Sequence, residues 1–477
     1  MRVMYAVLVI TALLSGCAST DWSSDAPTKA NPKTSKAARV NLKNQSVSKV
    51  YAPSDNLWIR IRDGFEMEPM ISPLEIEQVR WLAARPDYVN RSMTRSSRYL
   101  FYIVQEVNAR NMPTEIALLP FVESAFVTNA KSNAKAVGLW QFMPATGKDF
   151  RLTQNVFRDE RRDVVQSTDA ALDYLQRLNN QFGSWELALA AYNWGAGNIT
   201  KAQKRNAAAG LPIDYESLTL PRETRNYVPK LMAYRQIVLD PQAYGIVLPD
   251  LENHPYFVAV DVGNDIDVAL VIKLAEIPAD EFQILNPSFN KPVILSNANQ
   301  QILLPFAHAE IFQDNLKQYP KPLSSWTAVQ VSKTESVDQA AKTLGVDVDT
   351  LREVNGIPRG MRIRAGSTVL IPKTSRRPGD VSTAMAENAS LNLEKPAPPA
   401  PKCPKPAKGT KGAKSSKCAA PSNSKKGDKG ASKGNSSAKN AASQHKSEST
   451  GLAKSAKNGS SPASASSKAS KGVSKSQ

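Results

Sequence analysis

One carboxylate in the middle of the chain is placed where it could move protons. Glu123 lies inside the apolar run 120–126, PFVESAF. Burial among apolar side chains disfavours an ionised carboxylate and raises its pKa. A Glu with a pKa near neutrality can donate a proton to a leaving oxygen and then accept one back. The alternative is a partly exposed Glu at the end of a short helix.

Two further segments combine polar, aromatic and glycine residues in patterns that core packing does not require. In 138–144, GLWQFMP, apolar residues surround the amide of Gln141, which is either a binding group or a loop anchor. In 190–197, AAYNWGAG, a predicted helix carrying Tyr192 and Asn193 runs into a glycine-containing loop. Such a loop allows close backbone approach and stacking of aromatic rings on a sugar. Otherwise it is an ordinary helix end with a core tyrosine.

The segment 223–228, ETRNYV, opens the last predicted helix and contains Tyr227; its acid and base could also be simple surface partners. Together, in this order, the four segments resemble the goose-type-lysozyme-like domain of soluble lytic transglycosylases. The family pattern has a Glu-Ser pair, a Gly-Leu-Met-Gln stretch, an Ala-Tyr-Asn stretch with trailing glycines, and a late Glu-Thr-Arg-x-Tyr-Val. This chain departs from it at Trp140, where Met is usual, and we expect this change to alter a sugar subsite.

The resemblance implies a peptidoglycan lytic transglycosylase, a carbon–oxygen lyase that acts on a polysaccharide. In that family the counterpart of Glu123 is the single catalytic acid and base. It cleaves the β-1,4 bond between N-acetylmuramic acid and N-acetylglucosamine and leaves 1,6-anhydromuramic acid ends. No metal and no cofactor are implied. The residues expected to bind the glycan or shape the cleft are Ser124, Gln141, Tyr192, Asn193 and Tyr227.

Three other functions stay open at this point. A hydrolase on the same scaffold would use water in place of the C6 hydroxyl group of the muramic residue. A catalytically inactive lipoprotein would bind peptidoglycan through a glycan-binding module. A third protein type would act through its basic tail on anionic polymers. The intact Glu123, Gln141 and Asn193 argue against the inactive binder.

These side chains need a helical scaffold, and residues from about 55 to 240 have its pattern. The segment SPLE at 72–75 predicts a helix start, with a capping Ser, a Pro at the first helical position and a Glu three residues after the cap. A later helix is predicted to open at Ser167 or Thr168 and to close at Gly183. The sequence thus predicts a compact, mainly helical domain.

After residue 250 the pattern changes to short apolar runs separated by Pro and Asn turns, which favours strands. The segment 326–372 predicts strand, helix, helix and strand. It resembles LysM, the glycan-binding repeat for N-acetylglucosamine polymers, although Thr334 stands where that family usually has Gly. Residues 256–306 look like a degenerate relative or a spacer. The four predicted strands are 256–260, 302–304, 328–331 and 368–371.

The chain begins like an exported lipoprotein. An apolar run of 12 residues, 3–14, is too short to span a bilayer and matches an export signal. It continues into LSGC, which resembles a lipobox with Cys17 as the lipidated residue; the alternative is a plain secretory signal. Acyl chains on Cys17 would anchor the mature protein. Since Ala18 follows rather than Asp, we expect it at the periplasmic face of the outer membrane.

The net charge of +18 lies mostly in the C-terminal stretch 375–477, which holds 20 of the 61 basic residues and 5 of the 43 acidic ones. This stretch lacks Phe, Trp and Tyr, so we predict disorder. Export excludes nucleic acid as its partner. The three cysteines are Cys17 and two in this stretch, so a CxxC metal or redox centre in the folded part is excluded. The three histidines lie outside the four segments described above, so a histidine-based site in those segments is excluded as well.

The predicted protein is an α+β multidomain chain, a mainly α-helical lysozyme-like catalytic domain followed by small βααβ modules and a disordered basic tail. We expect a monomer whose partners are peptidoglycan strands and a membrane. The predicted parts are a signal peptide 1–16, a tether 17–54, a helical extension 55–94, the catalytic domain 95–245, a degenerate LysM-like segment or spacer 250–310, a LysM domain 324–373 and the tail 375–477.

Overall fold

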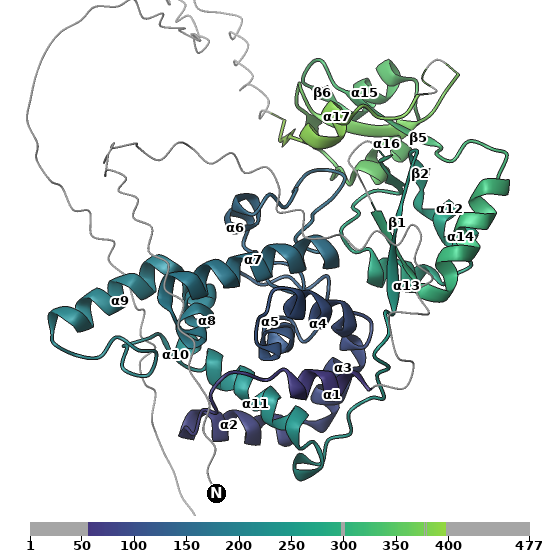
Figure 1. Ribbon diagram of the computed structural model, residues 1–477. Coiled ribbons are helices and arrows are strands. Elements are labelled where there is room, and N and C mark those ends of the chain that lie inside the picture. Colours follow the sequence, from purple (N-terminus) through teal and green to yellow (C-terminus); the bar gives the residue numbers. More distant parts are fainter. Residues whose placement is uncertain (1–55, 297–300, 376, 378, 397–477) are drawn as a thin grey trace, which may run out of the picture. The chain divides into compact units, whose positions relative to one another are not determined.

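The computed structural model describes residues 56–296, 301–375, 377 and 379–396 (Figure 1). The predicted signal peptide 1–16, the lipidated Cys17 and the tether 17–54 lie outside the described residues, as does the tail from residue 397. Across the described ranges, no helix combines the length and apolar character needed to cross a membrane.

The described chain up to Gly245 is helical, as predicted for the catalytic region. Its elements in chain order are α1 (Leu57–Asp63), α2 (Pro73–Ala83), α3 (Pro86–Ser96), α4 (Leu100–Ala109), η2 (Thr114–Leu118), α5 (Leu119–Glu123), α6 (Pro144–Asp149), α7 (Val164–Phe182), α8 (Trp185–Trp194), α9 (Ala196–Ala208), α10 (Arg222–Arg225), α11 (Tyr227–Leu239) and η3 (Gln242–Tyr244).

Side-chain caps set the helix ends. Ser72 accepts a hydrogen bond from the backbone at the third position of α2, which confirms the predicted start. The start predicted for α7 at Ser167 or Thr168 is wrong. The side chain of Asp163 accepts hydrogen bonds from two backbone N–H groups and starts the helix a turn earlier, so Ser167 and Thr168 are buried within it. Gly183 ends α7 in the left-handed conformation, as predicted.

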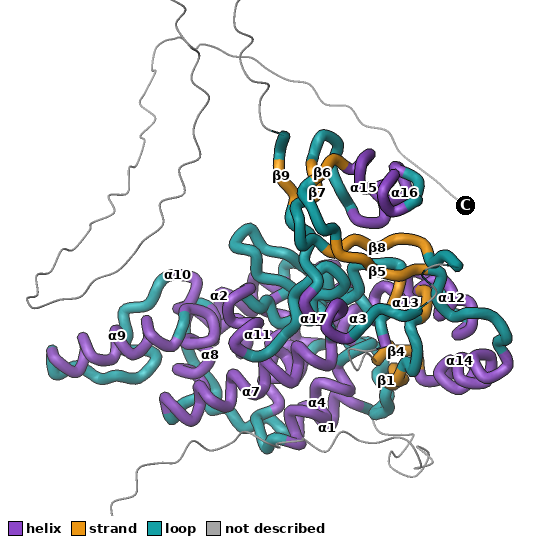
Figure 2. Tube along the Cα trace, turned by 90° about the horizontal axis from the view of Figure 1, so that it is seen from above, coloured by secondary structure: helices purple, strands orange, loops and turns teal. Residues whose placement is uncertain are grey.

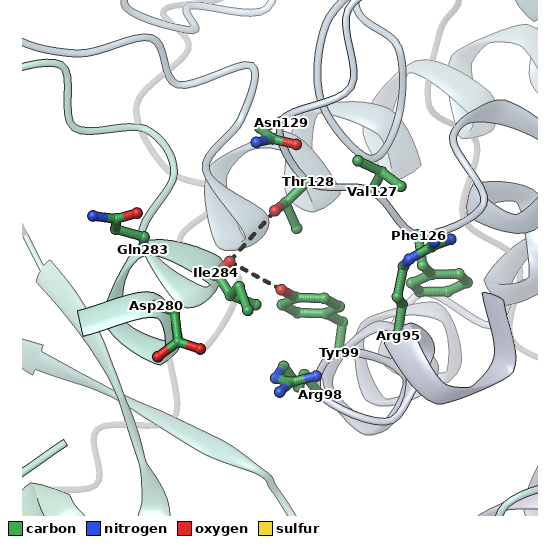
Figure 3. Close-up of a pocket in the computed structure, with 10 residues that line it drawn as sticks. All are labelled: Arg95, Arg98, Tyr99, Phe126, Val127, Thr128, Asn129, Asp280, Gln283 and Ile284. Carbon is green, nitrogen blue, oxygen red and sulfur yellow. Dashed lines mark hydrogen bonds between the residues drawn. The ribbon is translucent and has the colours of Figure 1, made fainter. Parts of the chain in front are cut away.

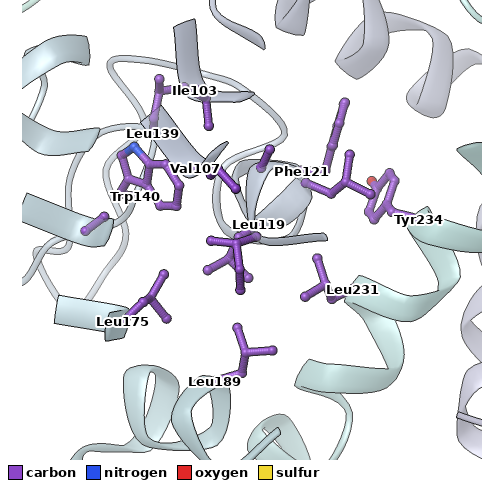
Figure 4. Close-up of a cluster of buried hydrophobic side chains, with 14 of the residues drawn as sticks. Ile103, Val107, Leu119, Phe121, Leu139, Trp140, Leu175, Leu189, Leu231 and Tyr234 are labelled. Atoms are coloured by element: carbon purple, nitrogen blue, oxygen red, sulfur yellow. The ribbon is translucent and has the colours of Figure 1, made fainter. Parts of the chain in front are cut away.

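One hydrophobic core joins these helices (Figure 4). Side chains from α5, α7, α8 and α11 converge there, and Leu119, Leu175, Leu189 and Leu231 have no exposed surface. Full burial of a leucine side chain contributes about 1.5–3 kcal/mol. The core therefore fixes α5, α8 and α11, which carry Glu123, Tyr192, Asn193 and Tyr227, relative to one another.

Two small α/β modules follow, and all the strands lie in this part of the described chain (Figure 2). The first contains β1 (Phe257–Asp261), β2 (Ile266–Asp267), α12 (Val268–Ala275), α13 (Ala279–Leu285), β3 (Val293–Ile294) and β4 (Gln301–Pro305), followed by α14 (Phe306–Gln318). The second contains β5 (Trp326–Gln330), β6 (Glu335–Ser336), α15 (Val337–Leu344), α16 (Val348–Asn355), β7 (Arg362–Ile363) and β8 (Thr368–Pro372).

The two modules repeat one topology. In each, the first strand pairs antiparallel with the last, and the two short strands pair with each other. Each also buries one asparagine that bridges the second helix and the last strand. The amide of Asn286 donates to the carbonyl of Leu303 and accepts from its N–H, both at 2.8 Å. Asn355 does the same with Leu370, at 2.9 and 2.7 Å.

Side-chain contacts join the helical part to the first module. Arg98 forms a bidentate ion pair with Glu281, with a shortest distance of 2.9 Å. The Tyr99 hydroxyl donates to the carbonyl of Ile284 at 2.9 Å. Bidentate arginine–carboxylate pairs restrict orientation as well as adding energy. The first module is thus held against the turn between α3 and α4 by directional bonds.

The prediction of disorder from residue 375 onward is wrong for residues 379–396. They include α17 (Thr383–Asn388) and β9 (Leu393–Glu394), and β9 extends the small sheet of the second module by pairing with β7. Val381, Ala386 and Ala389 are buried in a shared apolar cluster. The average composition of the long tail concealed this short apolar stretch, whose partners exist only in the tertiary structure.

Candidate active site

The structure brings the predicted acid and one predicted tyrosine into contact. Glu123 is the last residue of α5, and Tyr227 is the first residue of α11. The Tyr227 hydroxyl donates a hydrogen bond to Oε1 of Glu123 across 104 residues of sequence. Packing of α5 and α11 in one core holds this pair in place.

Glu123 has a pKa of about 7, raised from the ordinary value of 4.5. Burial of the carboxyl is the largest cause. The hydrogen bond from Tyr227 opposes the rise, Glu223 adds to it, and Lys230 lowers it. Both protonation states are therefore populated near neutral pH, so this one carboxyl can donate a proton and accept one.

Tyr192, on the last turn of α8, directs its hydroxyl elsewhere. It donates a hydrogen bond to the backbone carbonyl of Trp140 at 2.8 Å. Burial raises the pKa of Tyr192 and of Tyr227 well above 10, so each hydroxyl keeps its proton. Tyr192 thus ties α8 to the loop that carries Gln141.

The turn after the acid has strained backbone. Ala125 and Phe126 have φ of 50° and 59°, in the left-handed region, which costs about 1–2 kcal/mol for each such residue. Tertiary bonds hold the turn. Ser124 donates its hydroxyl to the carbonyl of Leu139 at 2.9 Å, and Arg95 donates to the carbonyl of Ala125 at 3.2 Å. Ser124 therefore links the end of α5 to the neighbouring loop.

The Gln141 loop depends on a glycine. Gly138 has φ of 89°, and a Cβ there would lie 2.0 Å from the carbonyl oxygen of Arg161. The Gln141 side chain donates from Nε2 to the carbonyl of Gly138 at 2.8 Å. Gln141 therefore anchors its own loop through Nε2, and this contact does not involve its Oε1 atom. Within the described ranges, its Oε1 atom accepts no protein hydrogen bond.

The expectation that Trp140 alters a sugar subsite is wrong for its side chain. The indole ring has no exposed surface and lies in the hydrophobic core (Figure 4). Its Nε1 donates to the hydroxyl of Thr168 at 2.9 Å. A buried indole needs such a partner for its N–H. Trp140 reaches the site only through its backbone carbonyl, which Tyr192 holds.

Sequence reasoning missed one residue of the site. The hydroxyl of Thr224, in α10, donates to Oδ1 of Asn193 at 2.8 Å. Thr224 is 2% exposed. Its position within the ETRNYV segment was the available signal, but nothing in the sequence placed it against Asn193.

A pocket of about 300 Å³ lies beside the strained turn, between the helical part and α13 (Figure 3). The hydroxyls of Tyr99 and Thr128 both donate hydrogen bonds to the carbonyl of Ile284 there. Glu123 is not among its lining residues, so this pocket is separate from the acid. Across the described ranges, no three metal-binding side chains cluster in a way that could hold a metal ion. The pocket is lined by Arg95, Arg98, Tyr99, Phe126, Val127, Thr128, Asn129, Asp280, Gln283 and Ile284.

Two family models match the chain. The model described as "Transglycosylase SLT domain" matches residues 102–211, which contain Glu123, Gln141 and Asn193. The model described as "Lytic transglycosylase MltD, LysM-like domain" matches residues 256–321. That second match covers the first module, the segment that the sequence suggested to be a degenerate relative or a spacer.

Full-length relatives match as well. Two proteins named membrane-bound lytic murein transglycosylase D, from Escherichia coli strain K12 and from Escherichia coli O6:H1, are each 32% identical over 382 residues, covering 77% of this chain and 84% of theirs. The crystal structure of the 70 kDa soluble lytic transglycosylase from Escherichia coli has a TM-score of 0.25 and 22% identity, over 34% of this chain and 30% of that one.

Proposed function

Because the chain belongs to the membrane-bound lytic murein transglycosylase D family, we propose that Glu123 is the acid and base of its reaction. The protein is a lytic transglycosylase that acts on peptidoglycan. The observation that supports the role of Glu123 is a carboxyl with a pKa of about 7 that accepts a hydrogen bond from Tyr227. General acid–base catalysis by one positioned side chain contributes about 10²–10⁴-fold.

In the proposed first step, Glu123 protonates the bridging oxygen of the β-1,4 bond between N-acetylmuramic acid and N-acetylglucosamine. The C1–O bond breaks while the oxygen of the substrate's own 2-acetamido group bonds to C1. In the second step, the Glu123 carboxylate accepts the proton of the C6 hydroxyl, whose oxygen bonds to C1 and displaces the acetamido oxygen. An intramolecular hydroxyl has an effective molarity on the order of 10⁵–10⁸ M, which lets it outrun water.

The remaining residues have proposed supporting roles. Tyr227 stabilises the carboxylate after its proton has left. Ser124 fixes the backbone that follows the acid, and Tyr192 fixes the loop beside it. Gln141 and Asn193 bind the glycan with their half-buried amides.

The mass of the products tests the reaction type. Digestion of purified peptidoglycan is expected to release muropeptides with 1,6-anhydro ends. A hydrolase on the same scaffold would instead leave reducing ends that are one water heavier. Predominance of the heavier product would exclude the lytic reaction.

We also propose that both α/β modules bind glycan, because the first matches a LysM-like family model and the second repeats its topology and its buried asparagine. Co-sedimentation with peptidoglycan, using the Glu123→Gln variant so that the polymer stays intact, tests this. Binding that is unchanged after both modules are deleted would refute it. An inactive binder would retain this binding but release no muropeptides.

The anchor is proposed from the sequence and from the name of the relatives, which are membrane-bound. Cys17 is the proposed site of lipidation, and the periplasmic face of the outer membrane is the proposed location. A Cys17→Ser variant is expected to move from the membrane fraction to the soluble fraction after cell breakage. Retention of that variant in the membrane fraction would exclude Cys17 as the anchor.

A further inference from the structure

We propose that Thr224 is a positioning residue that turns the side-chain amide of Asn193 so that its NH₂ group faces the glycan. This inference rests on the proposed function and assigns a specific polarity to one of its binding residues.

The amide of Asn193 is held by one end. Its Oδ1 accepts the Thr224 hydroxyl at 2.8 Å. Within the described part of the chain, Nδ2 of Asn193 donates to no protein acceptor. Because the oxygen end of the amide faces Thr224 and the residue is only half-buried, the two amide hydrogens at the other end are the group turned toward a ligand.

The position of Thr224 is itself fixed by hydrogen bonds from Tyr215. α10 has only four residues, so it does not fix its own position. The Tyr215 hydroxyl donates to the carbonyls of Thr224 at 3.0 Å and of Arg225 at 2.9 Å. Burial raises the pKa of Tyr215, so this hydroxyl stays a donor. Tyr215 lies in none of the four motif segments, yet it fixes the threonine that fixes Asn193.

The second amide of the site is held the opposite way. Gln141 donates from Nε2 to the carbonyl of Gly138, which leaves its Oε1 as the group for a ligand. The site thus offers one amide donor, on Asn193, and one amide acceptor, on Gln141. An N-acetylamino sugar carries the matching pair, an acetamido oxygen or hydroxyl oxygen that accepts and an N–H that donates. We therefore assign oxygen recognition to Asn193 and N–H recognition to Gln141.

The test compares a substitution that keeps the shape of threonine with one that keeps its hydroxyl. Thr224→Val removes the hydroxyl, whereas Thr224→Ser keeps it. On soluble uncrosslinked peptidoglycan strands, Thr224→Val is expected to lower kcat/KM about tenfold, because it removes the hydrogen bond to Oδ1 of Asn193 and frees the amide to rotate. Thr224→Ser should stay within about threefold of wild type. The matched control is Thr94→Val, on the exposed face of α3, whose hydroxyl bonds only within its own helix.

A double-mutant cycle separates positioning from general stability. If Thr224 acts through Asn193, Thr224→Val has little further effect in an Asn193→Ala background. Asn193→Asp, which still accepts from Thr224 but offers an oxygen to the glycan, should lose activity as severely as Asn193→Ala. Independent losses in the cycle, or full activity of Asn193→Asp, would overturn the inference.

Two further variants, Tyr215→Phe and Glu123→Gln, allow the test of Thr224 to be interpreted. If Thr224→Val does not fold, Tyr215→Phe tests the same chain of contacts, because Tyr215 fixes Thr224. This variant is expected to lower kcat/KM about threefold. Release of 1,6-anhydro products by wild type, and their loss in Glu123→Gln, reports on the proposed function separately. A normal Glu123 response combined with a silent Tyr215→Phe and Thr224→Val would therefore refute only the positioning role.

Discussion

Tyr227 donates its hydroxyl hydrogen bond to the carboxyl of Glu123 from a helix that begins 104 residues later in the chain. Burial favours the neutral carboxyl, whereas this hydrogen bond favours the ionised one. The two effects leave the pKa of Glu123 at about 7. A proton donor that is also a usable base thus results from packing α5 against α11.

Replacing Tyr227 with Phe should move the pH dependence of the reaction. Without the hydrogen bond, the pKa of Glu123 rises further above its ordinary value. Since Glu123 must be protonated to act first, the alkaline limb of the kcat/KM profile should shift to higher pH, and the maximum should fall about tenfold. Profiles of wild type and Tyr227→Phe measure this, with Tyr319→Phe in the first module as control. An unmoved alkaline limb would contradict the role of the bond.

Glu123 should also make the free energy of unfolding depend on pH. Its pKa is about 7 in the folded protein against an ordinary 4.5, so the folded state holds the proton more tightly than the unfolded chain. This contribution is complete below about pH 4.5 and is lost as pH rises through 7. Glu123→Gln should therefore gain about 1–3 kcal/mol over wild type between pH 5 and 8, as measured by urea unfolding. A difference that does not change with pH would show that the carboxyl is not buried in solution.

Replacing Trp140 with Met, the residue usual in the family pattern, should affect folding rather than chemistry. The change removes the bond to Thr168 and leaves a void in the core. We expect a loss of about 1–3 kcal/mol in the free energy of unfolding, with kcat/KM within about threefold of wild type. Trp81→Met is the control, because that indole is 44% exposed. A large fall in kcat/KM without a fall in stability would argue for a direct role of the indole.

The segment 379–396 should be needed for stability, whereas the chain beyond it should not. A protein ending at residue 374 loses the strand that pairs with β7 and uncovers the cluster around Leu370. A protein ending at residue 396 keeps both. Thermal unfolding of the two truncated proteins should show a lower Tm for the shorter one only. Equal Tm values would mean that α17 and β9 contribute nothing.

Local signals made much of the fold predictable. Ser72 marks a helix start because its side chain satisfies the backbone of its own first turn. The start of α7 was missed because Asp163 caps it from a position where the apolar spacing gave no hint. The helix and strand in 379–396 could not be predicted, because their apolar partners come from distant parts of the chain.

The site divides in the same way. Glu123, Gln141, Asn193 and Tyr227 could be proposed as site residues from motifs, because each lies in a segment whose residue types core packing does not require. The contact of Thr224 with Asn193, the strained turn after Ser124 and the full burial of Trp140 depend on how separate helices pack. Sequence spacing contains no information about those distances.

The most direct test of the central claim is the product spectrum of Glu123→Gln. Purified peptidoglycan is digested with wild type, with Glu123→Gln and with Glu77→Gln, which changes an exposed glutamate of α2, and the soluble products are analysed by mass spectrometry. We expect release of 1,6-anhydromuropeptides to fall by about 10²–10⁴-fold in Glu123→Gln and to stay at the wild-type level in Glu77→Gln. Undiminished release by a folded Glu123→Gln protein would show that another group carries the proton.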